Sequence, residues 1–278
     1  MIARRTWRTV EPIHGMIYFS PEAAAGYESL GLTGRMGYFA SRAAPMGAVP
    51  AEVVIATFYN FRPQLVRDAI PAAWAIATPE RIVATRVAAA DAALRRSLPD
   101  AIGTPDLAEA ATLARVAAEA ACERLDGRPL FAGHAALPWP DASHLVLWHA
   151  QSLLREYRGD GHIAALVVAG LNGLDAAITH VATGDVPGGV MTATRDWPAD
   201  EGNAGIDRLR ARGILQPGDE LTLTDLGREQ RQWIEDATDA AAVAAYEALG
   251  EDGCARFRAL ARPLSRTIID GGLLAPPS

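Results

Sequence analysis

The stretch RLRARGILQPGDELTLTDLGREQRQWIEDATD, residues 208–239, decides the fold expected for this chain. A helix leading into it should stop at Gly213, because glycine readily adopts the left-handed backbone of a helix C-terminus. The apolar segments IL and LTL flank the turn QPGD at residues 216–219, which predicts a short β-hairpin. Thr224 then provides the N-cap of a long helix. The pattern is helix, hairpin, helix.

The remainder of the chain favours helices. Half of its 278 residues are apolar but only 6% are aromatic, so Ala, Leu, Val and Ile must build the core of a mainly α-helical protein. This length suffices for two domains. The Gly- and Pro-rich segment at residues 127–143 predicts the boundary between them. We expect two packed helical units, residues 1–130 and 141–278, the second carrying the hairpin.

A short sequence repeat favours two related units. Cys122 is followed by Arg-Pro-Leu at residues 128–130, and Cys254 is followed by Arg-Pro-Leu at residues 262–264. This predicts a tandem pseudo-repeat. The two cysteines are interpreted as reduced thiols. The sequence contains no run of about 18 apolar residues, so it predicts no membrane-spanning helix. A cytoplasmic protein with no membrane partner is expected.

Two family resemblances follow. Residues 160–250 resemble the winged-helix core of MarR-like transcription regulators, in which a recognition helix ends in glycine, a wing follows, and a motif like LTDLGR at residues 223–228 opens the dimerisation helix. The whole chain also resembles a largely actinobacterial helix-turn-helix family through the segments EPIHGMIYF, ATFYNF, LLREYRGDGH and WIEDATD. These resemblances imply a winged helix-turn-helix fold, DNA binding and a homodimer, but no particular reaction.

The charge of the chain argues against tight DNA binding. The net charge is −7, and residues 171–230 carry ten acidic residues against five arginines. Asp200 and Glu201 lie at the start of the expected recognition helix, while Asp219 and Glu220 lie at the tip of the expected wing. Affinity for nucleic acid depends mainly on neutralising phosphates. Nucleic acid is therefore the less expected partner.

The densest polar chemistry lies in HAQSLLREYRGDGH, residues 149–162. Gly159 is expected to end one helix and Asp160 to cap the next, so that the chain reverses there between the two units. Two interpretations remain open. In one, salt bridges among Arg155, Glu156, Arg158 and Asp160 fix the angle between two helices. In the other, the polar side chains line a ligand pocket in the cleft between the units.

The second interpretation assigns roles to individual residues. The candidates for acid–base catalysis are His149, Glu156 and His162. The candidates for ligand binding are His14, Tyr59, Asn60, Trp148, Arg155, Arg158 and Asp160. Arg155 or Arg158 would bind an anionic group.

Several common sites lack their sequence motifs. The chain has no HExxH, no CxxC and no closely spaced histidine pair, so no metal site is expected. It also has no GxSxG, GxGxxG or GxxxxGK[ST], which argues against a serine nucleophile and the usual nucleotide sites. The cofactor, if any, is left unknown.

The leading hypothesis is a small-molecule-binding protein on a winged-helix scaffold, with an organic ligand in the cleft between the units. Whether it also catalyses a reaction is left open. The alternative is a ligand-responsive, DNA-binding regulator of the MarR type.

Overall fold

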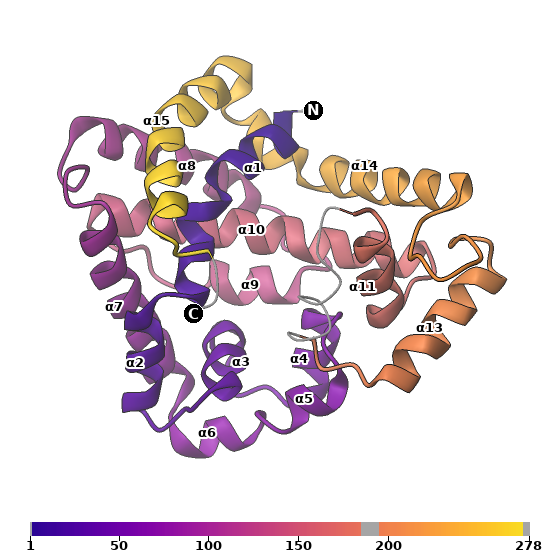
Figure 1. Cartoon of the computed structure of the whole chain (residues 1–278). Coiled ribbons are helices and arrows are strands. Elements are labelled where there is room, and N and C mark those ends of the chain that lie inside the picture. The colour runs from indigo at the N-terminus through magenta and orange to yellow at the C-terminus, as the bar shows by residue number, and fades with distance from the viewer. Residues whose placement is uncertain (1, 185–194, 275–278) are drawn as a thin grey trace.

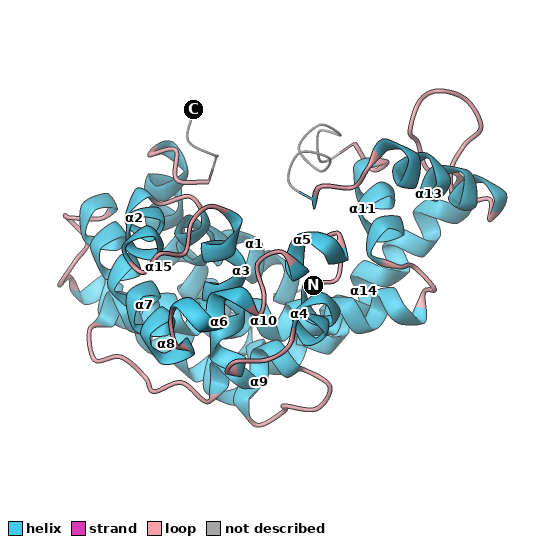
Figure 2. Cartoon of the chain, turned by 90° about the horizontal axis from the view of Figure 1, so that it is seen from below, coloured by secondary structure: helices cyan, strands magenta, loops and turns pink. Residues whose placement is uncertain are grey.

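The computed structural model describes residues 2–184 and 195–274, and within these ranges the fold is built from helices (Figures 1 and 2). The helices are α1 (Ile2–Gly15), α2 (Pro21–Ser29), α3 (Arg35–Ala43), α4 (Ala51–Phe58), α5 (Pro63–Arg67), α6 (Ala72–Ile76), α7 (Pro79–Ser97), α8 (Pro105–Cys122), α9 (Pro129–Ala135), α10 (Ser143–Val168), α11 (Gly173–Val181), α13 (Ala199–Ala211), α14 (Asp225–Glu247) and α15 (Gly250–Asp270). Two short 3₁₀ helices are η1 (Met16–Tyr18) and η2 (Ala44–Met46). The mainly α-helical class is confirmed.

No single helix among the described residues is long and apolar enough to cross a membrane. Only α10 and α11 taken together reach the required length and composition, and that pair is bent by 99°.

Helix starts follow the capping signals of the sequence. At five of the described helix starts, the side chain of the N-cap residue accepts a hydrogen bond from the backbone N–H three residues later, which satisfies one of the free N–H groups of the first turn. Residues that cap in this way are Ser20, Thr78, Thr104, Asn172 and Thr224. In α2, α7 and α8 the next residue is proline, whose fixed φ suits the first helical position.

The expected reversal at residues 159–161 is wrong, because α10 runs unbroken through these residues. Gly161 instead allows α14 to approach: a Cβ atom added there would lie 3.1 Å from Cβ of Ala241. Asp160 lies inside α10, so the expectation that it caps a following helix is wrong. Its Oδ2 accepts a hydrogen bond from the backbone N–H of Phe131, at 2.9 Å, and so ties α9 to α10. The glycine serves close helix packing, not a turn.

The continuous helix α10 links two hydrophobic clusters. The first contains α1 to α9, the N-terminal half of α10, the end of α14 and α15. The second contains the C-terminal part of α10 with α11, α13 and the start of α14. Figure 1 shows α11 and α13 on one side of the molecule, beyond the main body. The division of the core thus falls within α10. The two helical units expected from the sequence, residues 1–130 and 141–278, stay a prediction.

The predicted β-hairpin is wrong, since no strand forms in the described ranges. Leu215 and Leu223 make one isolated antiparallel bridge, and the N–H of Gln216 donates to the carbonyl of Thr222 at 2.9 Å. The arms are too short to extend this contact into a ladder. The loop is anchored to α14 by Gly227, where a Cβ atom would lie only 2.2 Å from the carbonyl oxygen of Ile214.

The two Arg-Pro-Leu segments have different structural roles. Pro129 occupies the start of α9, whereas Pro263 lies inside α15. The shared tripeptide therefore gives no structural support to the pseudo-repeat, which stays a prediction.

A buried carboxylate joins α1, α10 and α14. Asp239 is 1% exposed, and its Oδ1 accepts from Nη1 of Arg158 at 2.6 Å. Its Oδ2 lies 2.7 Å from Nε of Arg4, in a contact that is an ion pair without hydrogen-bond geometry. One acidic side chain on α14 thus compensates cations from two other helices.

Replacing Asp239 with alanine should lower the free energy of unfolding by about 3–5 kcal/mol, because Arg158 would be left buried without its main counterion. Urea denaturation checks this. Glu119→Ala is the matched control, since its ion pair with Arg115 is exposed and is expected to contribute about 0.3–0.5 kcal/mol. Equal losses in the two variants would contradict the structural role of Asp239.

Candidate functional site

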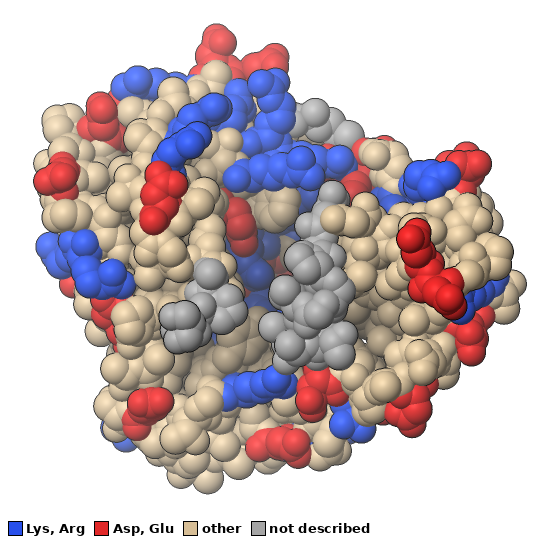
Figure 3. Space-filling model, in the orientation of Figure 1, with Lys and Arg blue, Asp and Glu red and all other residues tan. Residues whose placement is uncertain are grey.

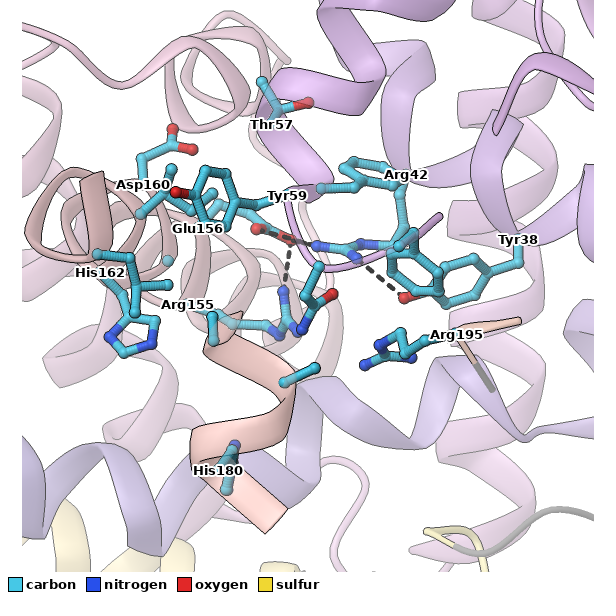
Figure 4. Close-up of a pocket in the computed structure, with 18 of the residues that line it drawn as sticks. Tyr38, Arg42, Thr57, Tyr59, Arg155, Glu156, Asp160, His162, His180 and Arg195 are labelled. Carbon is cyan, nitrogen blue, oxygen red and sulfur yellow. Dashed lines mark hydrogen bonds and ion pairs between the residues drawn. The ribbon is translucent and has the colours of Figure 1, made fainter. Parts of the chain in front are cut away.

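A polar cavity of about 210 Å³ lies where the two hydrophobic clusters meet. Its walls come from α3, α4 and residues 59–61 on one side, and from α10, α11 and Arg195 on the other (Figure 4). The arginines that line it are Arg42, Arg155, Arg195 and Arg231. We call this cavity the arginine pocket. Figure 3, in the orientation of Figure 1, shows basic side chains deep in a hollow near the centre of the visible face.

Glu156 lies between two of these arginines (Figure 4). Both of its carboxylate oxygens are 3.3 Å from Nη2 of Arg42, and Oε1 also accepts from Nη1 of Arg155 at 2.9 Å. Arg155 is held from the other side by Glu11, whose Oε1 is 3.1 Å from Nε. Arg42 in addition donates to the hydroxyl of Tyr38 at 2.9 Å.

The electrostatic potential at this point is positive. Burial alone would raise the pKa of Glu156, but Arg155 and Arg42 outweigh burial and hold it well below the usual range. The hydroxyl of Tyr38 responds similarly, since burial opposes ionisation yet the nearby Arg42, Arg195 and Arg155 lower its pKa.

Charged groups of both signs surround the pocket. Among the described lining residues are four arginines and the two carboxylates of Glu156 and Asp160. Two further carboxylates lie outside the lining, where Glu11 pairs with Arg155 and Glu235 pairs with Arg231. Burial raises the pKa of Asp160 to about 6, and burial lowers the pKa of His162 to about 4. The imidazole is therefore neutral at pH 7, and guanidinium groups are the cations of the described lining.

His14 does not line the pocket but joins α1 to α10 beside it. The Ser152 hydroxyl donates to the carbonyl of Trp148 at 3.0 Å, so it must accept from Nδ1–H of His14, at 2.8 Å. The unprotonated Nε2 of His14 then accepts from the hydroxyl of Tyr18 at 2.6 Å. Burial lowers the pKa of His14 well below its ordinary value. This histidine is a fixed neutral link between α1 and α10.

Arg195 connects the pocket to α13. Its guanidinium lies over the ring of Phe61, 4.1 Å from the centroid, and its carbonyl accepts from the N–H of Arg62 at 3.3 Å. Two residues later, the indole of Trp197 donates to the carbonyl of Asn60 at 3.1 Å. The chain that enters α13 is thus attached to residues 60–62 of the other side.

Tyr59, which directly precedes residues 60–62, contacts α11 and the residues just before it. Its hydroxyl donates to the carbonyl of Leu171. The backbone of Tyr59 comes so close to α11 that a Cβ atom on Gly173 would lie 1.9 Å from its carbonyl oxygen. Only glycine permits this approach, so residues 59–61 form a close junction between the two clusters.

The structure separates the residues predicted for the site. Those that line the arginine pocket are Tyr59, Asn60, Arg155, Glu156, Asp160 and His162. Trp148 and His149 line another cavity, between α7 and α10. Arg158 faces α14, where it pairs with Asp239 and Glu235, and His14 lies behind the pocket. The predicted network among Arg155, Glu156, Arg158 and Asp160 forms only in the Arg155–Glu156 pair.

Several pocket residues escaped prediction from sequence. They are Tyr38, Arg42, His180, Arg195 and Arg231. Arg42 offered one usable signal, because it is a lone charge in the apolar segment YFASRAAP and must find a partner if buried. Arg195 follows a loop expected at residues 181–190, most of which lies outside the described residues.

The geometry limits the chemistry available here. Glu156 is held as a carboxylate by two guanidinium groups and does not exchange protons near neutral pH. Nδ1 of His162 hydrogen-bonds with the hydroxyl of Thr238 at 2.9 Å. Within residues 2–184 and 195–274, no group of three or more His, Cys, Asp or Glu could hold a metal ion. The arrangement is suited to binding an anion.

Comparison with known proteins places the chain in a family. The model of a helix-turn-helix family matches residues 3–275, which is nearly the whole sequence. The chain belongs to this helix-turn-helix family. No curated protein and no solved structure matches it. The family supports the helix-turn-helix resemblance, while the MarR-like and actinobacterial parts of that resemblance stay predictions.

Two residues on one helix should have opposite effects on the pH dependence of stability. Asp160 has a raised folded pKa, so the folded state binds more protons near pH 5 and stability falls as pH rises toward 6. His162 has a lowered pKa of about 4, so the unfolded state binds more protons and stability rises with pH over the same interval.

We expect Asp160→Asn to make the slope of unfolding free energy against pH more positive at pH 5, by up to about 1.4 kcal/mol per pH unit. His162→Gln should make the slope more negative by a similar amount. Urea denaturation between pH 4 and 7 measures both. Unchanged slopes would show that these groups titrate alike in the folded and unfolded states.

Proposed function

We propose that this protein is a ligand-responsive helix-turn-helix regulator whose ligand is a small organic anion bound in the arginine pocket. The gathering of four arginines around one cavity at the junction with α13 carries this proposal. Guanidinium groups bind carboxylates through charge-assisted and often bidentate hydrogen bonds, so several of them around one cavity favour an anionic ligand. The helix-turn-helix family membership favours regulation over catalysis, and the immobilised carboxylate of Glu156 agrees with it.

The pocket also has apolar walls. Phe58, Phe61 and Leu166 line it beside the arginines. A ligand that combines a carboxylate with a compact apolar body matches both kinds of wall, since the carboxylate would meet the guanidinium groups and the body would cover the rings. Inorganic anions would use only the first kind of contact.

Ligand occupancy can reach the helix-turn-helix unit through Arg195. This residue lines the pocket and lies four positions before the first residue of α13. Its neighbour Trp197 packs with the second hydrophobic cluster and bonds to Asn60. An anion that pulls Arg195 further into the pocket would therefore change how α13 is held. This gives the coupling between binding and response a physical route.

Benzoate should bind in the wild-type protein, and Arg195→Gln should weaken that binding by about tenfold or more, as expected for the loss of a charge-assisted hydrogen bond. Isothermal titration calorimetry checks this. Arg62→Gln is the matched control, because Arg62 pairs with Glu201 nearby and does not line the pocket. Benzamide, which lacks the charge, should bind weakly to both. Equal binding of benzoate and benzamide would rule out an anion site.

The proposed response is DNA binding with few phosphate contacts. The arginines of α13 are engaged within the protein: Arg208 pairs with the buried Asp175, Arg210 donates to the carbonyl of Gly218, and Arg212 donates to the carbonyl of Gly170 at 2.9 Å. The exposed surface of α13 also carries Asp200 and Asp207. We propose a MarR-like unit in which base contacts and helix positioning outweigh phosphate contacts.

Selection from a random duplex library, with and without benzoate, tests this response. We expect the ligand to change the recovered sequences or their affinity. The affinity of a selected duplex should fall only gently with salt, with a slope of log K against log [salt] no steeper than about −2, because few phosphates are neutralised. A slope near about −6 would contradict the proposed interface. Failure to enrich any duplex would remove the regulatory part and leave anion binding intact.

A further inference from the structure

A second cavity lies away from the arginine pocket, between α7, η2 and the N-terminal half of α10. Its volume is about 830 Å³, several times that of the arginine pocket. Side chains that line it include Val83, Val87, Leu137, Trp139, Trp148 and His149. We call it the apolar groove. It is large enough for a molecule of two or three rings.

Charge distinguishes the groove from the arginine pocket. Glu80 and Asp91 are its charged lining residues, and no arginine is among the described residues that line it. The acidic Asp91 already pairs with Arg95 and His144 at the groove's edge. Arg115 lies over the ring of Trp139, 4.6 Å from its centroid, and pairs with Glu119 outside the lining. The described lining itself offers an anionic ligand two carboxylates and no guanidinium group. The lining therefore favours an uncharged occupant.

Two buried polar groups in the wall lack partners within the protein. His149 is 5% exposed and Trp148 is 3% exposed, yet Nε2 of the first and Nε1 of the second make no hydrogen bond. A buried donor or acceptor that has lost its hydrogen bonds to water and gained none in the protein destabilises the folded state. Nearly all such groups in folded proteins have a partner, so each one needs an explanation.

We propose that the apolar groove is a second ligand site, which takes an uncharged aromatic molecule bearing a hydroxyl group. The ring system would lie against Trp139 and the aliphatic side chains of α7. The hydroxyl would pair with the imidazole of His149, and because a hydroxyl both donates and accepts, it suits either neutral tautomer. Burial lowers the pKa of His149 to about 4, so this imidazole is neutral at pH 7.

The groove is distinct from the arginine pocket in position as well as chemistry. His149 and His162 lie 13 residues apart on the continuous α10, which corresponds to about 20 Å along its axis and to different faces. The proposal therefore does not depend on anion binding. Each site has its own probe, and each can fail alone.

The test uses 2-naphthol as the probe, with tryptophan fluorescence and calorimetry as readouts. Wild-type protein should bind 2-naphthol, and Ala84→Trp should weaken binding about tenfold or more by filling the groove from an exposed position on α7. Ala92→Trp is the control: the same change at another exposed position of α7 that does not line the groove. No binding to wild type, or equal binding to both variants, would overturn the proposal.

The hydrogen bond is tested by comparing 2-naphthol with naphthalene. His149→Phe should weaken binding of 2-naphthol by about three- to tenfold, the usual contribution of one hydrogen bond, and leave naphthalene nearly unchanged. Equal weakening of both would overturn the role of His149. If this variant does not fold, judged by its helical circular dichroism, the Ala84→Trp result still decides whether the groove binds.

Charge selection gives a third comparison. 2-Naphthoate should bind the groove more weakly than 2-naphthol, because its carboxylate would meet the carboxylates of Glu80 and Asp91. Binding of 2-naphthol should be unaffected by Arg195→Gln. Loss of 2-naphthol binding in that variant would place the probe in the arginine pocket and overturn the second site.

Discussion

The continuity of α10 is the constraint on which the rest of the structure depends. Its N-terminal half is packed in the first hydrophobic cluster and its C-terminal part in the second. The helix α14 runs beside it and also belongs to both clusters, with its start in the second and its end in the first. The contacts at residues 59–62, at Gly173 and at Trp197 close the junction at further points.

This arrangement explains why charged residues are concentrated in the middle of α10. Where two apolar cores meet, neither supplies enough side chains to fill the junction, and polar groups can be buried there only if they satisfy one another. Glu156 and Arg155 are paired with residues from α1 and α3, and Arg158 is paired with α14. The compensation is complete on the α14 side, at Asp239. On the side of the arginine pocket, Glu156 lies between Arg42 and Arg155, and Glu11 holds Arg155 from α1.

The capping signals made much of the helical architecture predictable. Ser20-Pro21, Thr78-Pro79 and Thr104-Pro105 are local, and a local hydrogen bond plus a fixed φ leaves few alternatives. The break expected at Gly159 failed for the opposite reason. Glycine in a helix is unfavourable by about 1 kcal/mol, so the sequence pattern favoured a break. The close contact between Gly161 and Ala241 is a tertiary contact between two helices, and the local sequence around Gly161 does not reveal it.

The candidate site was predictable in part. Six of the ten predicted residues line the arginine pocket, because Glu156, Asp160 and their neighbours are close in sequence and the Tyr59-Asn60 pair is unusually polar for its surroundings. His149 was grouped with them because it lies two turns before Glu156 on a similar side of the same helix. Those two turns amount to about 10 Å along the axis, and at that level of α10 the neighbours are α7 and residues 137–140. Arg42 is 114 residues from Glu156, and separations of that size are set by packing alone.

The same geometry bears on how a ligand signal would travel. A rigid α10 cannot transmit a change by bending at residues 159–161, so a hinge at that position is not available to the molecule. The segment from Arg195 to Trp197 contacts Asn60, Phe61 and Arg62, and it leads directly into α13. Under the proposed function, a ligand that favours one position of this segment over another would change how α13 is held. The helix α10 would then be the frame against which the segment moves.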